Sequence, residues 1–261
     1  MRPRVVLAQF FINLGTFIQS LAAPLMRPDD LVEFGRRHYG REHSVEFWAA
    51  NALTDSGLDP EEKALLDKVP SRSGRALVLC LGGGREAFAL ARMGFEVTGV
   101  DFVPNMVERV KANAAERGVR IEGLVQEISA LDVPAGSYDM AWLSAAMYSC
   151  IPTRARRVTM LQRVARALRP GGFFICRFYF DRDAGRFCAR HVLRKAFGFL
   201  TLGNLRYERG DVLFGNAEFL HAFSSEAELR TEFEEGGFEM IEMQLVEEKK
   251  RGGVVLLKAE G

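Results

Sequence analysis

The chain has 261 residues, 48% of them hydrophobic, and a formal net charge of +1. This length and apolar content suffice for one large domain with its own core, and the near-neutral charge argues against nucleic acid as a partner. The neighbouring Arg154, Arg156 and Arg157 are a cluster of the kind that usually forms a solvated helix face. Four histidines are scattered along the chain and predict no metal site.

The cysteines have no Cys-x-x-Cys spacing, which indicates small buried side chains in a reducing, cytoplasmic compartment. They are Cys80, Cys150, Cys176 and Cys188.

The first predicted element is an uncharged helix over residues 5–25. Its polar residues recur at helical spacing on one narrow stripe, opposite a wide apolar face, which is typical of a helix lying on an apolar surface. That surface is the domain's own, a partner's or a membrane interface. Since the stripe holds no lysine or arginine, we favour packing on protein over a peripheral membrane contact. A cleaved signal or a spanning segment is the third alternative.

Residues 28–70 are predicted to be helical. Asp29 and Asp30 are candidates to cap one helix, and Pro60 with Glu61 and Glu62 begins another. We therefore expect residues 1–70 to form an N-terminal helical segment, followed by an α/β domain over residues 71–261.

That domain opens with the most informative pattern in the chain. An apolar run over residues 76–81 leads into three glycines, then a helical pattern, and then a second apolar run that ends on Asp101. This order of strand, glycine turn, helix, strand and acid is typical of a doubly wound sheet that binds a nucleoside cofactor. Glycine lets the backbone approach the ligand, and the carboxylate can accept both ribose hydroxyl protons.

The second half of the domain continues the alternation of strands and helices. A strand is predicted over residues 137–143, a helix over 153–168, and a turn at Leu168-Arg169-Pro170-Gly171-Gly172 before the strand 173–180. With the glycine turn and Asp101, these segments resemble the class I S-adenosylmethionine-dependent methyltransferases over residues 74–258. The resemblance implies a Rossmann-like, seven-stranded mixed sheet with an antiparallel last strand. Residues 238–246 and 253–258 are expected to form the antiparallel pair of strands at its end.

The resemblance also implies which residues contact S-adenosyl-L-methionine. Phe102 and, more weakly, Met106 are expected near the adenine, Glu127 takes its amino hydrogen, and the amide of Ile128 reads a ring nitrogen. The other expected contacts are Gly82, Gly83, Gly84, Asp101 and Ser144. The family often places its N-terminal helices over the cofactor as a lid, which makes Tyr39, His43 and Trp48 candidates to face the pocket.

Residues 181–223 form a long insert that is expected to cover the substrate. Weak catalytic candidates are His221, Tyr148 and Tyr179, and further polar candidates are Asp181, Tyr207 and Glu218. Because no Asp-Pro-Pro-Tyr or Asn-Pro-Pro-Tyr motif follows the fourth strand, we expect a small, largely apolar acceptor. Cys80 and Glu86 depart from the family pattern, and they motivate the alternative of a non-catalytic cofactor-binding scaffold or sensor.

Overall fold

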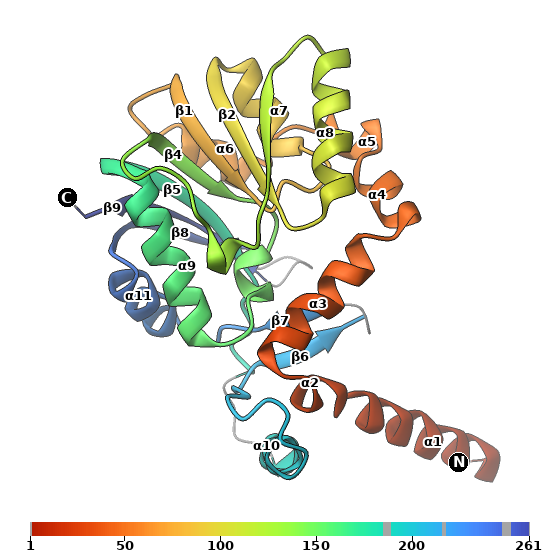
Figure 1. Ribbon diagram of the computed structural model, residues 1–261. Coiled ribbons are helices and arrows are strands. Elements are labelled where there is room, and N and C mark those ends of the chain that lie inside the picture. The colour runs from red at the N-terminus through yellow and green to blue at the C-terminus, as the bar shows by residue number, and fades with distance from the viewer. Residues whose placement is uncertain (1, 185–188, 216–217, 247–251, 261) are drawn as a thin grey trace.

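The computed structural model describes residues 2–184, 189–215, 218–246 and 252–260. Its centre is a seven-stranded sheet with the strand order β3-β2-β1-β4-β5-β9-β8 (Figure 1). The strands from β3 to β5 are parallel, and β9 runs antiparallel to β5 and β8. This confirms the predicted mixed sheet. The strands are β1 Gly74–Leu79, β2 Phe95–Asp101, β3 Ile121–Val125, β4 Tyr138–Leu143, β5 Leu168–Phe178, β8 Phe238–Val246 and β9 Gly252–Ala259.

Helices cover both faces of the sheet. Because successive side chains of a strand point to opposite faces, Leu77 and Leu79 pack into one core cluster, and Ala76 and Val78 into the other. The first cluster is shared with α9 (Arg154–Ala167) and α11 (Glu226–Glu235). The second is shared with α6 (Pro60–Leu66), α7 (Arg85–Arg92) and α8 (Pro104–Glu116).

The segment Leu168–Gly172 was predicted to be a turn, and this is wrong in part. α9 ends at Ala167, and Leu168 already pairs with Tyr138 as the first residue of β5. The register then shifts, so that Met140 pairs with Phe173. An irregularity inside the strand thus takes up the residues that were expected to form the loop.

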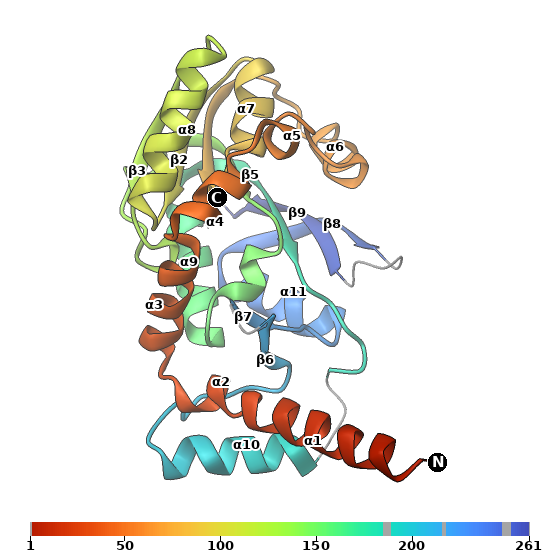
Figure 2. The same ribbon diagram turned by 90° about the vertical axis from the view of Figure 1, so that its right-hand side faces the viewer.

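The N-terminal segment runs along the carboxyl ends of the strands and then away from the sheet (Figure 2). Val45 packs against Val103 and Met106, which joins the segment to the start of α8. The helices of this segment are α1 Pro3–Gln19, α2 Ala22–Leu25, α3 Pro28–Tyr39, α4 Glu42–Trp48 and α5 Asn51–Thr54.

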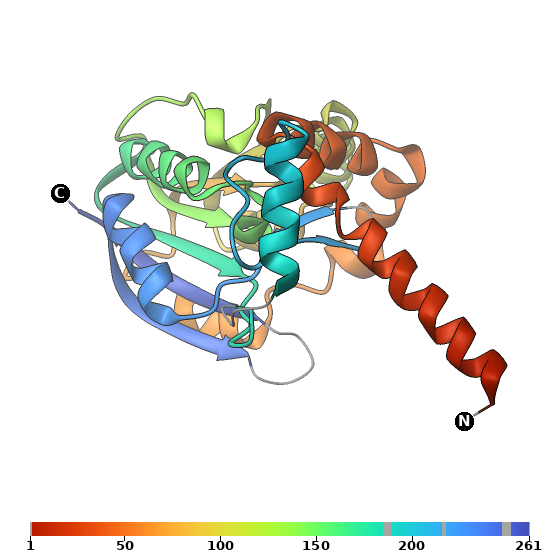
Figure 3. The ribbon, with the colours of Figure 1, turned by 90° about the horizontal axis from the view of Figure 1, so that it is seen from below.

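The predicted helix over residues 5–25 is present, and its expected docking on the chain's own surface holds only for the end of the segment. Ala23 and Pro24 are buried, and Phe17 is half-buried. α1 itself has no buried residue, and it extends past the edge of the molecule (Figure 3) with residues 3–14 exposed. Residues 3–25 are also long and apolar enough to cross a membrane, with a mean hydropathy of 1.6.

The insert forms α10 (Ala189–Leu200) and a two-stranded antiparallel sheet of β6 (Asp211–Phe214) and β7 (Glu218–His221). Two short 3₁₀ helices, η1 (Ile128–Ala130) and η2 (Met147–Cys150), follow β3 and β4. Cys188 lies outside the described residues. Cys80, Cys150 and Cys176 are free thiols.

Candidate cofactor site

The glycine turn between β1 and α7 is built from left-handed backbone. Cys80, Gly82 and Gly84 have φ angles of 53°, 51° and 93°. Gly83 is required for a different reason, because a Cβ there would lie 1.9 Å from the carbonyl oxygen of Trp48. The lack of a side chain therefore lets the N-terminal segment lie directly against the turn.

Asp101 fixes this turn to the end of β2. Its Oδ2 accepts the N–H of Gly82 at 3.0 Å, and its Oδ1 accepts the N–H of Val103 at 2.9 Å. Burial raises the pKa of the Asp101 carboxyl, while these backbone donors oppose that shift. Since a carboxylate has about four accepting positions, roughly two are open to further donors. A vicinal diol such as that of ribose fits this requirement.

A cavity of about 300 Å³ lies at the carboxyl ends of β2 and β3, where it is lined by Phe102, the residue that follows Asp101. The Phe102 ring forms one wall, and the Arg36 guanidinium of α3 lies 5.6 Å from the centre of that ring. Glu127 forms another wall, where it accepts the N–H of Ser129 at 2.9 Å and the Ser129 hydroxyl at 2.6 Å. An aromatic face and a fixed carboxylate suit a flat base with an exocyclic amino group. The sequence analysis missed Arg36, because an arginine on a charged helix resembles a solvated residue.

Ser144 follows β4 next to the glycine turn. Its N–H donates to the carbonyl of Leu79 at 3.2 Å, whereas its buried Oγ has no hydrogen-bond partner among the described residues. Since buried hydroxyl groups are normally paired, this atom marks a position where a ligand donor or acceptor fits. The turn, Asp101, the cavity and Ser144 together fit a nucleoside cofactor.

Of the expected contacts, Phe102 and Glu127 are the two that line this cavity. Met106 is buried against Val45 and Val103, because the first turn of α8 faces the N-terminal segment. The Ile128 side chain lies in the main core, and the role of its amide stays a prediction. His43 is exposed, so its side chain does not face this site.

The two departures from the family pattern have structural explanations. The Glu86 carboxylate lies 2.6 Å from Arg85, which also binds Glu62 at 3.0 Å and so ties α6 to α7. Glu86 thus starts a helix and does not occupy the turn. Burial and the neighbouring Asp101 raise the pKa of the Cys80 thiol, which keeps it neutral.

Tyr148 was a catalytic candidate, but the structure places it in the core. Its hydroxyl donates to Oε2 of Glu232 at 2.6 Å, and its ring stacks on Phe223. The same carboxylate binds Arg157 at 2.9 Å. Arg157 is fully buried, so its assignment to a solvated face is wrong. This network anchors η2 and α9 to α11.

His221 is also buried. Its Nδ1 lies 2.7 Å from Oδ1 of Asp211. Burial lowers its pKa, but the hydrogen bonds to Asp211 and Glu228 outweigh this effect and raise the pKa to about 9. Atoms of Glu208, Asp211 and His221 lie within 4.8 Å of one another, a spacing that metal ligands can have. Asp211 pairs with His221, and Glu208 with Arg157 at 2.8 Å, so these groups neutralise one another.

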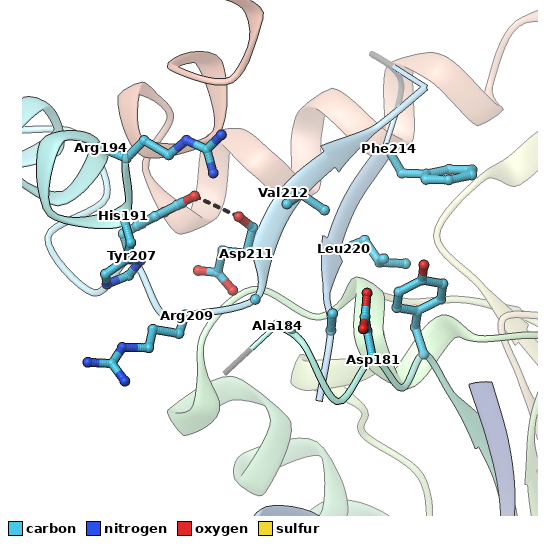
Figure 4. Close-up of a pocket in the computed structure, with 13 residues that line it drawn as sticks. Asp181, Ala184, His191, Arg194, Tyr207, Arg209, Asp211, Val212, Phe214 and Leu220 are labelled. Atoms are coloured by element: carbon cyan, nitrogen blue, oxygen red, sulfur yellow. Dashed lines mark hydrogen bonds between the residues drawn. The ribbon is translucent and has the colours of Figure 1, made fainter. Parts of the chain in front are cut away.

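Tyr179 lies elsewhere, on a second cavity of about 300 Å³ formed largely by the insert (Figure 4). The His191 ring stacks on Tyr207, whose hydroxyl donates to the carbonyl of Asp211 at 2.6 Å. Burial and the nearby Arg209, Lys195 and Arg194 lower the pKa of His191. Arg194 and Arg209 line this cavity together with the acidic Asp181 and Asp211.

Another group of side chains, formed by Tyr39, Cys150 and Glu218, joins the N-terminal segment to the insert. The Cys150 thiol donates to Oε1 of Glu218 at 3.0 Å. Burial, and after it the charge and hydrogen bond of Glu218, raise the pKa of Tyr39 well above its usual value. Burial, and after it Glu218 and Cys80, also raise the pKa of the Cys150 thiol. The group holds a carboxylate that can accept a proton.

Comparison with known proteins agrees with this geometry. Residues 76–172 match the family model of a methyltransferase domain. A ubiquinone biosynthesis O-methyltransferase of Xanthomonas axonopodis is 31% identical over 99 residues, which cover 38% of this chain and 40% of the relative. An uncharacterized methyltransferase of Mycobacterium bovis is 30% identical over 51% of each chain. The chain thus spans about half the length of these curated relatives, or less.

Solved structures match over a larger part of the fold. The 1,6-didemethyltoxoflavin-N1-methyltransferase of Burkholderia thailandensis, with S-adenosylhomocysteine bound, covers 90% of this chain at a TM-score of 0.62 and 18% identity, and 91% of its own chain is matched. A methyltransferase of Methanosarcina mazei covers 78% of this chain and is matched over 99% of its own length, at a TM-score of 0.61 and 22% identity.

The fold and site define a nucleoside-cofactor-binding α/β domain. Residues 76–172 of this domain match a methyltransferase-domain model, and the domain has the fold of solved S-adenosylmethionine-dependent methyltransferases.

Proposed function

We propose that this protein transfers a methyl group from S-adenosyl-L-methionine to a small, largely apolar acceptor. The observation that carries the proposal is the arrangement at the end of β2, where Asp101 binds the glycine turn and the next residue, Phe102, lines a cavity together with Glu127. When bound, the cofactor supplies an electrophilic methyl group on sulfur. The protein then has to place the acceptor and exclude water, and such positioning can lower a bimolecular barrier by about 7–11 kcal/mol.

Glu218 is the residue we assign to proton removal from the acceptor. It belongs to the insert, its carboxylate accepts a hydrogen bond from the Cys150 thiol, and it influences Tyr39 of the N-terminal segment. An acceptor with a hydroxyl or N–H group loses its proton to this carboxylate as the new bond forms. A general base of this kind contributes about 10²–10⁴-fold to the rate. The choice of a small ring compound is supported by two similar proteins, one named a ubiquinone biosynthesis O-methyltransferase and the other an N1-methyltransferase with bound 1,6-didemethyltoxoflavin.

The test is formation of S-adenosylhomocysteine over a panel of phenols, catechols and nitrogen heterocycles. We expect turnover with at least one ring acceptor, and Glu218→Gln should lower kcat. Glu226→Gln, on the exposed first turn of α11, is the matched control. Cofactor binding without turnover on every acceptor would favour the scaffold alternative.

A further inference from the structure

The end of the molecule farthest from α7 and α8 is rich in exposed apolar side chains. Figures 1 and 2 both place α1, α2 and α10 at this end, with α1 and α10 running mainly across it. We call the residues 3–27 and 189–206 the α1/α10 face. On α1, Phe10, Phe11, Ile12 and Ile18 are all more than half exposed.

α10 and the residues after it add a second apolar row. Phe199 is 70% exposed and Leu200 is 80% exposed, and Leu202 and Leu205 continue the row. A soluble surface rarely gathers so many large apolar side chains, and such patches mark contact with a protein or a membrane. The row is independent of α1 because it comes from the insert.

Close backbone contacts join the two segments into one surface. The Asn204 N–H donates to the Pro24 carbonyl at 2.8 Å, and the Arg194 side chain donates to the Ser20 hydroxyl at 3.1 Å. A Cβ on Gly203 would lie 2.4 Å from the carbonyl oxygens of Pro24 and Leu25, so the chains touch there. The end of α1 is therefore fixed against α10.

The α1/α10 face carries positive charge and no negative charge. The chain holds 34 acidic residues, but residues 1–28 and 184–207 contain none. The lysines and arginines of the face are Arg4, Arg27, Arg190, Arg194, Lys195 and Arg206, and Arg2 lies just before it. Apolar side chains bordered by cations complement an anionic lipid surface, whose headgroups attract lysine and arginine.

We propose that the α1/α10 face docks the protein on an anionic bilayer, with both helices lying in the plane of the interface. A second copy of the chain fits less well, because pairing this face with itself brings its cations together with no acidic partner. Spanning by α1 alone would leave the apolar row of α10 unexplained. The proposal concerns binding to lipid and is independent of the proposed methyl transfer.

The test is co-sedimentation of the full chain with phosphatidylcholine vesicles that contain or lack phosphatidylserine. We expect binding to the anionic vesicles, weakened by salt, and at least tenfold weaker binding by the double variant Phe199→Asp, Leu200→Asp. Both residues are exposed, so the melting temperature of this variant should be unchanged. Ile241→Asp, an exposed apolar residue on β8, is the matched control and should bind like the unsubstituted chain.

Three results would overturn the proposal. Equal vesicle binding by the double variant would show that α10 takes no part. Resistance to extraction at alkaline pH would show that α1 spans the bilayer. Failure to bind vesicles, together with a dimer in size-exclusion chromatography that the double variant abolishes, would show that a second copy covers the face.

Discussion

The sheet and the segments that cover its carboxyl edge are held together in different ways. In the sheet, apolar residues alternate between two core clusters, and backbone bonds set the register. The N-terminal helices and the insert 181–223 instead depend on charged pairs that join distant parts of the chain. Glu62 binds Arg85 of α7, and Arg157 of α9 binds both Glu208 of the insert and Glu232 of α11. The cofactor edge is therefore specified by local sequence, whereas the segments that cover it are specified by long-range pairs.

The largest effect should follow from breaking one of those pairs. Glu232→Gln leaves Arg157 buried without its main counter-charge, so the free energy of unfolding should fall by about 3–5 kcal/mol. Urea unfolding measures this change. The control is Glu235→Gln, whose exposed partner is Arg154, and it should change stability by less than about 1 kcal/mol. Equal effects of the two variants would contradict the difference drawn between buried and surface pairs.

His221 makes the same network sensitive to pH. Its pKa in the folded protein is about 9, above the value of about 6.5 expected when unfolded. Because the raised pKa means that folding favours the charged form, the stabilisation is complete below about pH 6.5 and is lost as the pH rises through 9.

The expected loss is at most about 3 kcal/mol, measured as the free energy of unfolding against pH. His221→Gln should remove this slope between neutral and alkaline pH. A slope that persists in the variant would assign the effect to another group.

A smaller effect is expected at the cofactor edge. Asp101→Ala removes a buried charged acceptor, which contributes about 1.5–3 kcal/mol, so S-adenosylmethionine should bind roughly 10- to 150-fold more weakly. Calorimetric titration measures the affinity. Asp101→Asn keeps one oxygen acceptor and should lose less. Unchanged affinity in Asp101→Ala would remove Asp101 from the binding site.

The smallest effect is expected from the contact between α3 of the N-terminal segment and Phe102 at the edge of the sheet. Arg36→Ala removes the guanidinium over Phe102, a contact of about 0.5–1 kcal/mol, so the cofactor should bind about two- to fivefold more weakly. Arg37→Ala is the matched control, because Arg37 is exposed and pairs only with Glu33 among the described contacts. A similar loss in both variants would indicate a general charge effect.

The features that could be predicted from the sequence are those that depend on neighbouring residues alone. The strands, the glycine turn and Asp101 follow from apolar runs and from the position of an acid at a strand end, and the structure brings Phe102 and Glu127 to one cavity as expected. Such features need no knowledge of distant residues.

The sequence failed where a partner lies far along the chain. Arg157 was predicted to be solvated because Glu232 lies 75 residues away, and Tyr148 shares that distant partner. α1 was expected to dock on its own domain. The apolar residues of a helix indicate that it packs on an apolar surface, but they do not indicate whether that surface belongs to the same chain, a partner or a membrane. No local feature of the sequence distinguishes Arg36, which lines the cavity, from the exposed Arg37.

The central claim is that the edge of the sheet at Asp101 binds S-adenosylmethionine. Calorimetric titration of the unsubstituted chain with S-adenosylhomocysteine and, separately, with NADH tests it most directly. We predict saturable binding of S-adenosylhomocysteine at one site and none of NADH. No binding of S-adenosylhomocysteine, or tighter binding of NADH, would contradict the account.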